Sequence, residues 1–250
     1  MTANRFFIDK NSIQSGSAFL HGKEHNHLSR VVRKKPGDEV YLFDDAGNTY
    51  LTEIEFIHKD RTKLSIIKKL PPQKKGVEII LGQAMLKMKN MEFILQKATE
   101  LGIHTFIPIK AERTIIKIKD NGKQKVERWK KISLSAAKQS GRSDLVKIEY
   151  PKSIQDMVTE YNTSNKILLT EKAEKNLKEI ILSPFFAGTG DPELPPSTII
   201  LVGPEGGWTE KEEEYIVMHG YTPACLGDLV LRSETAAISA ISAFTLFWKW

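Results

Sequence analysis

A pair of glycine-containing loops near the C-terminus constrains this chain more than any other feature. The first loop is VGPEGGWT at residues 202–209, and the second is LGDLVLRSETAA at residues 226–237. The apolar β-branched run at 198–202 predicts a buried strand before the first loop. Thr209 and Glu212 form a capping-box pattern that predicts a helix directly after it. The order of strand, glycine turn and helix predicts a ligand pocket at the carboxyl end of a strand.

The second loop carries polar side chains that suit the same pocket. We predict that Ser233 caps the helix that follows, with Glu234 and Thr235 in its first turn and Arg232 facing the ligand. Glycines let a ligand approach the backbone, and free N–H groups of turns and helix starts bind polar atoms. Neither G-x-G-x-x-G nor G-x-x-x-x-G-K-[ST] is present, which excludes the usual dinucleotide and triphosphate motifs. A compact adenosine ligand fits, although each loop alone also fits an ordinary strand-to-helix turn.

The loop residues are similar to those of a known enzyme class. LVGPEGG at 201–207, LG at 226–227 and LRSETA at 231–236 resemble the cofactor loops of the SPOUT (trefoil-knot) methyltransferases. RFF at 5–7, HLSRVVR at 27–33 and QKATELG at 96–102 narrow the resemblance to the ribosomal RNA small subunit methyltransferase E family. The resemblance spans nearly the whole chain. It implies S-adenosyl-L-methionine-dependent methylation of N3 of a uridine in 16S rRNA.

Composition sets broad limits on the class of protein. Forty per cent of the 250 residues are hydrophobic, enough for one large domain or for a small and a medium one. Thirty-seven basic against thirty-one acidic residues favour an anionic partner slightly, although a solvated basic face would look the same. Cys225 is the only cysteine and cannot form an internal disulfide. With no apolar run of about 18 residues and no signal peptide, we expect a cytoplasmic protein without a membrane segment.

Two domains are predicted, at residues 1–72 and 73–250. Short apolar runs at 40–43, 50–54 and 64–67, separated by turn residues, predict a small β-barrel in the first domain. The segment LPPQKKG at 70–76 has the composition of a linker. Strand patterns at 77–81, 106–109, 166–169 and 198–202 then alternate with helices, which predicts an α/β domain with a mostly parallel sheet covered on both faces.

The resemblance refines this architecture. It implies that the first domain is a PUA-like barrel that holds RNA, and that the second is a SPOUT methyltransferase domain with a C-terminal trefoil knot. The physical rules alone predict an ordinary doubly wound sheet, because knotted chains are very rare.

Basic residues on two helical segments are candidates for RNA contact. The segment 24–32 predicts a short helix, and its histidines lack the cysteine or acidic partners of a metal site, so no metal is expected. The helical pattern over 123–142 is strongly basic and ends in KQSGR, whose arginine suits a phosphate. For both segments, the alternative to RNA contact is an ordinary basic surface exposed to solvent. The predicted RNA-binding residues are Arg5, His27, Arg30, Arg33, Lys138, Gln139 and Arg142.

The cofactor site and the dimer interface are predicted together. The helix starting near Ala236 has almost no polar face, so it is buried either in the core or in an isologous dimer seam. The resemblance favours a homodimer with the cofactor site beside that seam. We assign cofactor binding to Leu169, Thr170, Glu171, Val202, Gly203, Pro204, Glu205, Gly206, Gly207, Leu226, Gly227, Leu229, Leu231, Arg232, Thr235 and Ala236.

Methyl transfer from a sulfonium is an in-line displacement, so the chain needs no covalent nucleophile. Uridine N3 must lose a proton to attack, and a cationic group near its oxygens would stabilise the anion. Arg232 and Arg142 are the candidates for this charge stabilisation. Glu234 is the candidate base, although a capping role also suits it, and Glu205 is an alternative. The predicted partner is 16S rRNA or the small ribosomal subunit. Two competing hypotheses for the function are a SPOUT methyltransferase that acts on a ribose hydroxyl and a non-catalytic RNA-binding assembly factor.

Overall fold

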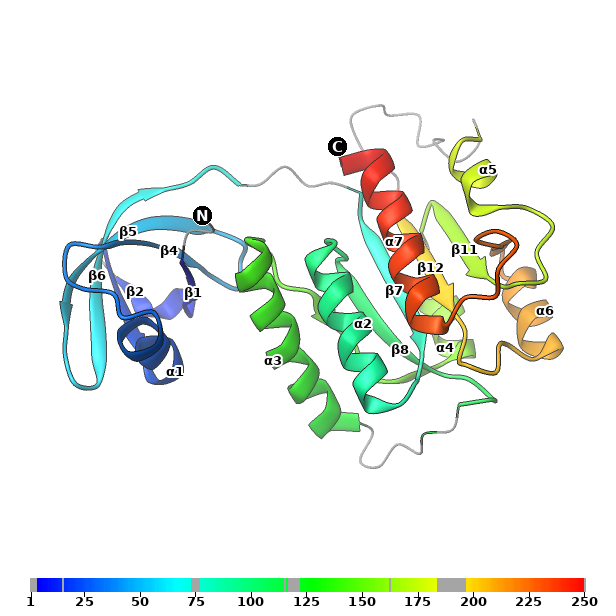
Figure 1. Ribbon diagram of the computed structural model, residues 1–250, viewed down its shortest axis with the longest axis horizontal. Helices are drawn as coiled ribbons and strands as arrows, with labels where there is room; N and C mark the ends of the chain where they lie inside the picture. The colour runs from blue at the N-terminus through cyan, green and yellow to red at the C-terminus, as the bar shows by residue number, and fades with distance from the viewer. Residues whose placement is uncertain are drawn as a thin grey trace. The chain divides into compact units, whose positions relative to one another are not determined.

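The computed structural model describes residues 4–14, 16–72, 77–114, 116, 122–161, 163–183 and 197–249, with side chains to residue 247. The chain divides by its contacts into two compact units (Figure 1). The first unit comprises residues 1–74 and 134–145, and the second comprises residues 75–133 and 146–250. The predicted domain limit at 72/73 stays a prediction, and residues 73–76 of the predicted linker lie outside the described residues.

The first unit is built on a curled six-stranded sheet that forms a half-barrel (Figure 1). Its strands are β1 (Arg5–Phe7), β2 (Ile13–Gln14), β3 (Ser17–His21), β4 (Glu39–Phe43), β5 (Thr49–Ile57) and β6 (Arg61–Lys69), in the order β1-β4-β5-β6-β3-β2. The 3-10 helix η1 (Lys10–Ser12) precedes β2. Alternate residues of the strands, among them Phe6, Leu20, Leu42 and Leu64, point into one core. The strands predicted from the three apolar runs are confirmed.

The helix predicted at 24–32 is two helical pieces, α1 (Gly22–Asn26) and a π-helical turn, η2 (His27–Val31). The wider turn is closed by hydrogen bonds from Val32 N–H to the His27 carbonyl and from Lys34 N–H to the Leu28 carbonyl. Arg33 lies between these donors with a φ of 58°, in the left-handed region that usually favours glycine. The segment therefore ends abruptly, and Leu28 is its anchor in the core.

The second unit contains a parallel sheet, as predicted. Its strands are β7 (Ile79–Ala84), β8 (Thr105–Lys110), β9 (Lys147–Ile148), β10 (Lys152–Ser153), β11 (Asn165–Leu169), β12 (Thr198–Val202) and β13 (Thr222–Ala224). The order is β10-β8-β7-β12-β11-β13, with β9 also paired to β8. Every pairing between these described strands is parallel.

Helices cover both faces of this sheet, and successive strand residues alternate between two cores. Ile79 and Leu81 pack on one face, whereas Ile80 packs on the other. The first face is covered by α2 (Met88–Glu100), α3 (Lys123–Ser140), α5 (Leu177–Ile181) and α7 (Ser233–Lys249). The second face is covered by α4 (Ile154–Glu160) and α6 (Glu210–Met218). Burial on both faces explains why the strands are apolar throughout.

The C-terminal helix α7 is only partly buried. Ala237, Ala240, Ile241 and Phe244 are core residues that pack with α2, in front of the sheet in Figure 1. Leu246 and Phe247, by contrast, are 64% and 50% exposed. One face of the helix therefore belongs to the core, whereas Leu246 and Phe247 near its end are exposed. No described helix has the length and apolar character needed to cross a membrane.

Candidate active site

A cavity of about 610 Å³ lies at the carboxyl ends of β11, β12 and β13. Carboxyl ends of neighbouring parallel strands meet at one edge of a sheet, where open α/β folds place their ligands. The two glycine loops and the segment after β11 form its walls. Of the predicted cofactor residues, the cavity is lined by Leu169, Thr170, Glu171, Val202, Gly203, Pro204, Glu205, Gly206, Gly207, Leu226, Gly227, Leu229, Leu231, Arg232 and Ala236. Thr235 is exposed and is not among the lining residues.

The structure adds lining residues that the sequence did not indicate, namely Asn90, Trp208, Ala224, Cys225, Val230 and Ser233. Asn90 comes from the first turn of α2, more than one hundred residues before the glycine loops, and its side chain donates to Glu205 Oε1 at 3.4 Å. No local pattern marks such a residue. Trp208 and Ser233 lie within the two predicted loops, so their position beside the glycines was a usable signal.

The first loop depends on two glycines for different reasons. Gly207 has a φ of 69°, and its N–H donates to the Pro204 carbonyl at 2.9 Å to close a tight turn. Gly203 faces the indole of Trp208, and a Cβ at this position would lie 3.1 Å from the indole nitrogen. That nitrogen donates to the Leu169 carbonyl at 3.2 Å. Trp208 therefore joins the loop after β12 to the end of β11.

The second loop leaves backbone donors available to a ligand. Gly227 has a φ of 123°, and the N–H groups of Leu226 and Gly227 have no acceptor among the described residues. Leu229 and Val230, at the rim, are 80% and 78% exposed. The cavity thus combines apolar walls with backbone donors that have no acceptor among the described residues, a combination that suits a small organic ligand.

The predicted N-cap at Ser233 is wrong by one residue. Helix α7 includes Ser233, and the Arg232 carbonyl accepts the helical hydrogen bond from Ala236 N–H at 2.9 Å. The Ser233 hydroxyl instead donates to the Gly203 carbonyl at 2.6 Å and accepts from Gln83 Nε2 at 2.9 Å. The Gly203 carbonyl thus accepts from the hydroxyl that a cap would use, and Ser233 joins the two loops.

Two charged side chains at the cavity, Arg232 and Glu234, have groups without a partner among the described residues. Arg232 is exposed and has no hydrogen-bond or ion-pair partner among the described residues. Glu234 is half-buried, and its Oε2 is a buried atom without a hydrogen-bond partner within the described ranges. An unpaired guanidinium can stabilise negative charge on a substrate, and an unpaired carboxylate oxygen can accept a proton. The structure therefore places these two predicted catalytic residues on one cavity.

Comparisons with known proteins agree with this geometry. A family model for an RNA methyltransferase domain matches residues 73–245, and one for an RNA methyltransferase PUA domain matches residues 20–67. The chain is 31% identical over 246 residues to ribosomal RNA small subunit methyltransferase E of Bacillus subtilis (strain 168), covering 96% of this chain and 95% of the relative. The chain belongs to the ribosomal RNA small subunit methyltransferase E family.

Two solved structures in complex with S-adenosylmethionine resemble the chain over nearly its full length. The ribosomal RNA small subunit methyltransferase E of Neisseria gonorrhoeae has a TM-score of 0.85 and 26% identity, with 98% of each chain covered. A methyltransferase of Legionella pneumophila has a TM-score of 0.84 and 28% identity, with 99% of this chain and 98% of the other covered. The predicted α/β fold with a parallel sheet and a preceding PUA domain is confirmed, whereas the trefoil knot stays a prediction.

Arg142, the third predicted catalytic residue of this family member, belongs to the first unit and does not line the cavity. It is buried, and its Nε and Nη2 contact the two carboxylate oxygens of Asp144 at 3.1 and 2.6 Å. A buried arginine held by a carboxylate in this way can stabilise the segment that follows α3. Its catalytic and RNA-binding roles stay predictions.

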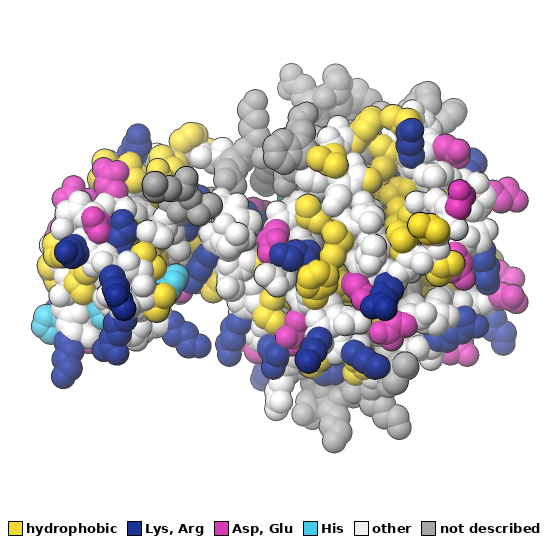
Figure 2. Space-filling view, in the orientation of Figure 1, with side chains coloured by type: hydrophobic (Ala, Val, Ile, Leu, Met, Phe, Trp, Pro, Cys, Tyr) yellow, Lys and Arg dark blue, Asp and Glu magenta, His cyan; other side chains and the backbone are white. Residues whose placement is uncertain are grey.

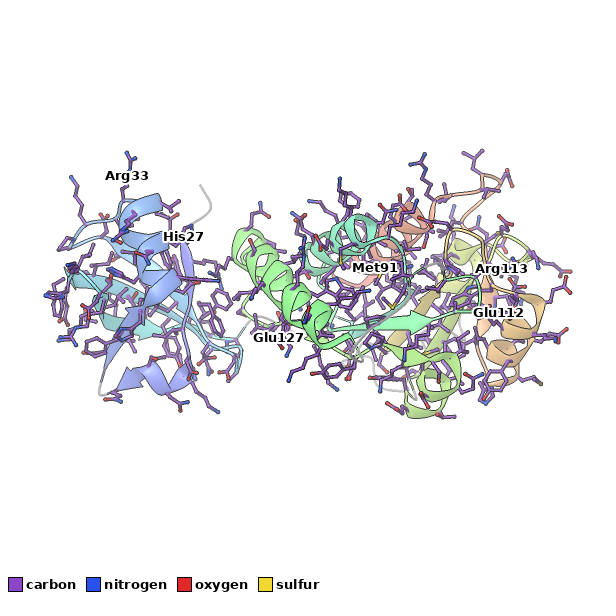
Figure 3. The ribbon with its side chains drawn as sticks, turned by 90° about the horizontal axis from the view of Figure 1, so that it is seen from below. His27, Arg33, Met91, Glu112, Arg113 and Glu127 are labelled. Atoms are coloured by element: carbon purple, nitrogen blue, oxygen red, sulfur yellow. The ribbon has the colours of Figure 1, made fainter. Side chains whose placement is uncertain are left out.

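The other predicted RNA-binding residues differ in how freely they can reach a ligand. Arg30, Arg33 and Gln139 are exposed, and Figure 3 shows Arg33 pointing away from its unit. Arg5 is half-buried over the Phe43 ring, 5.6 Å from its centroid, and burial lowers the pKa of its guanidinium.

Two further members of the set have partners within the first unit. His27 is half-buried, with its ring tilted against Phe6 at a centroid distance of 5.5 Å. Lys138 forms an ion pair with Glu24, whose other oxygen accepts the Phe7 N–H at 3.2 Å. Arg30 and Arg33 are consequently the best-placed cations of this set. The described residues contain no group of three or more potential metal ligands, and the absence of a metal stays an expectation.

Proposed function

We propose that this chain is an S-adenosylmethionine-dependent methyltransferase that methylates N3 of a uridine in 16S rRNA. The observation that carries the proposal is the cavity formed by both glycine loops. Its wall includes the exposed Arg232 and the Glu234 carboxylate, whose Oε2 has no partner among the described residues. Family membership and the relatives solved with S-adenosylmethionine support it. The N3 position is the finer part of the proposal and rests on the resemblance of the loops.

The residues of the cavity fit the cofactor. Leu169, Val202 and Leu226 supply an apolar surface for the adenine, and the unpaired N–H groups of Leu226 and Gly227 would meet its polar edge. The exposed Glu171 carboxylate would accept from ribose hydroxyls. A preformed pocket of this kind needs no triphosphate and no metal.

The cofactor supplies an electrophilic methyl group, and the chain prepares the attacking nitrogen. In the proposed reaction the N3 proton of the uridine passes to the Glu234 carboxylate, with Glu205 as the alternative base. The Arg232 guanidinium binds the oxygens over which the resulting negative charge spreads. N3 would then attack the methyl carbon, so that an N–C bond forms as the C–S bond breaks and S-adenosylhomocysteine leaves.

The first unit is proposed to hold 16S rRNA or the assembled small subunit through Arg30 and Arg33. Both side chains are exposed. Arg33 adopts a left-handed φ, although this conformation costs an L-residue about 1 kcal/mol. The sharp end of the π-helical turn is what presents it. Contacts of arginine with phosphate release counterions, so binding through them depends on salt.

Reversing both charges, Arg30→Glu with Arg33→Glu, is expected to weaken rRNA binding several-fold and leave cofactor affinity unchanged. The slope of log K against log salt should become shallower by about 1 to 2. Fluorescence anisotropy with a labelled rRNA fragment at several salt concentrations measures both quantities. Lys59→Glu with Arg61→Glu, a reversal of the same size elsewhere on this unit, is the control. Equal slopes for the two variants would contradict the assignment.

A homodimer is proposed through the exposed end of α7. Figure 2 shows hydrophobic side chains over α2 and α7, where Phe93, Leu246 and Phe247 are exposed. Side chains of this kind on neighbouring helices suit an isologous interface with a second copy. The molar mass in solution, measured by sedimentation equilibrium, tests this; a monomer at micromolar concentration refutes it.

The decisive experiment is nucleoside analysis of the product. Small subunits from a strain lacking the enzyme are incubated with the protein and labelled S-adenosylmethionine, and the digested rRNA is separated by mass spectrometry. The proposal predicts label in 3-methyluridine. Label in a 2′-O-methyl nucleoside identifies a ribose-directed enzyme, and rRNA binding without label identifies a non-catalytic assembly factor.

The lone cysteine provides a direct test of where the cofactor binds. Cys225 is half-buried on the cavity wall, and no other thiol in the chain competes for a maleimide reagent. Saturating S-adenosylmethionine is expected to slow the labelling of Cys225 markedly, because the ligand covers that wall. Stopped-flow labelling in the native state measures the rate, and denatured protein is the control for intrinsic reactivity. The same native rate with and without cofactor places the ligand elsewhere.

A further inference from the structure

The loop after β8, residues 111–114, contacts the first glycine loop although the two are separated by more than ninety residues. Arg113 Nη1 donates to the Gly206 carbonyl at 2.7 Å and to the Trp208 carbonyl at 3.3 Å. Strands β8 and β12 are not neighbours, because β7 lies between them. Arg113 therefore spans the end of a central strand to reach the cavity loop. Figure 3 shows Glu112 and Arg113 together on one side of the second unit.

Glu112 strengthens the same connection. Its N–H donates to Glu212 Oε1 at 2.7 Å, and its Oε2 accepts from the Thr209 hydroxyl at 3.3 Å. Thr209 and Glu212 are the capping box that begins α6. The loop after β8 is thus hydrogen-bonded both to the glycine turn and to the helix start that follows it.

The contact with Gly206 fixes a particular peptide plane. The carbonyl of Gly206 and the N–H of Gly207 belong to one planar unit, so they point in opposite directions. Arg113 holds the carbonyl, and the Pro204 carbonyl accepts the N–H at 2.9 Å. With both ends held, the peptide cannot rotate, and Gly207 keeps its φ of 69°. The turn is thereby maintained before any ligand arrives.

We propose that Arg113 is a positioning residue that holds the Gly206–Gly207 peptide in the conformation that binds the cofactor. This inference rests on the proposed function, because it concerns the same cavity. A side chain that preorganises a loop lowers the ordering cost of binding. Arg113 is exposed, so its hydrogen bonds contribute little to global stability. Its loss should therefore appear in cofactor affinity and not in the melting temperature.

Arg113→Ala and Arg113→Lys are compared with wild type by calorimetric titration of S-adenosylmethionine, by KM and kcat, and by thermal melting. The control is Arg128→Ala, which removes another exposed arginine of this unit, paired with Glu92 and absent from the cavity. We expect Arg113→Ala to raise Kd and KM for the cofactor about tenfold, with kcat at saturation little changed. Arg113→Lys, which keeps one charged donor, should recover part of the loss.

The outcomes separate this inference from the function on which it rests. A Kd for Arg113→Ala equal to that of Arg128→Ala overturns the positioning role and leaves the methyltransferase proposal intact. Weaker binding that only follows a large fall in melting temperature, with no recovery in Arg113→Lys, also overturns it in favour of a purely structural role. Absence of cofactor binding by the wild type refutes the proposed function and this inference together.

Discussion

Arg232→Ala is expected to lower kcat for rRNA methylation by about ten- to two-hundred-fold while the affinity for S-adenosylmethionine changes little. A charge-assisted hydrogen bond contributes roughly 1.5 to 3 kcal/mol, and the uridine anion that Arg232 would bind develops only as the reaction proceeds. Arg232 lines the cavity with no partner among the described residues, so its removal breaks no contact within them. Single-turnover kinetics, calorimetry and thermal melting on the same variant give the three quantities needed.

The competing role for Arg232 is to support the loop. In that case kcat, cofactor affinity and melting temperature fall together, which rejects the catalytic assignment. Unchanged kcat rejects both roles. Arg232→Lys sharpens the comparison, because it keeps the charge but not the planar donor pair. A lysine variant closer to wild type than the alanine variant points to charge as the requirement.

Gly203→Ala is expected to weaken S-adenosylmethionine binding by about tenfold or more and to lower the melting temperature. The added Cβ would lie 3.1 Å from the indole nitrogen of Trp208 and 3.3 Å from two of its carbons. Trp208 is buried and hydrogen-bonded to the Leu169 carbonyl, so it cannot move without disturbing β11. Overpacking of this kind costs about 1 to 3 kcal/mol, and the displaced indole is itself part of the cavity wall.

Gly206→Ala is the comparison for this prediction, since it adds the same methyl group to the same loop. Its Cβ would meet Arg113 Cδ at 3.5 Å, an ordinary van der Waals contact, and Gly206 is not among the glycines with positive φ. The loss of affinity should be clearly smaller than for Gly203→Ala. Equal losses, or the reverse order, would show that Trp208 does not form the wall inferred from its geometry.

Local sequence patterns were sufficient for the framework and for most of the cavity. The apolar runs at 198–202 and 166–169 became the parallel strands β12 and β11, because short runs of mostly apolar residues suit strands that are buried on both faces of a sheet. Thr209 and Glu212 form the predicted capping box. Carboxyl ends of parallel strands share one edge, and the glycine loops after β12 and β13, on either side of β11, both border the cavity. The family resemblance identified the cofactor as S-adenosylmethionine, whereas the spacing of the glycines alone did not.

Contacts between distant residues decided the rest. Ser233 was expected to cap α7, but its hydroxyl is taken by the Gly203 carbonyl thirty residues earlier. Lys138 was predicted to contact RNA, and the fold also brings Glu24, more than one hundred residues earlier, into an ion pair with it. Asn90 lines the cavity from α2, and Arg113 contacts the first glycine loop from the loop after β8. Periodicity and capping act over a few residues and can be read along the chain, whereas the partner of a polar side chain depends on which segments the completed fold brings within hydrogen-bonding distance.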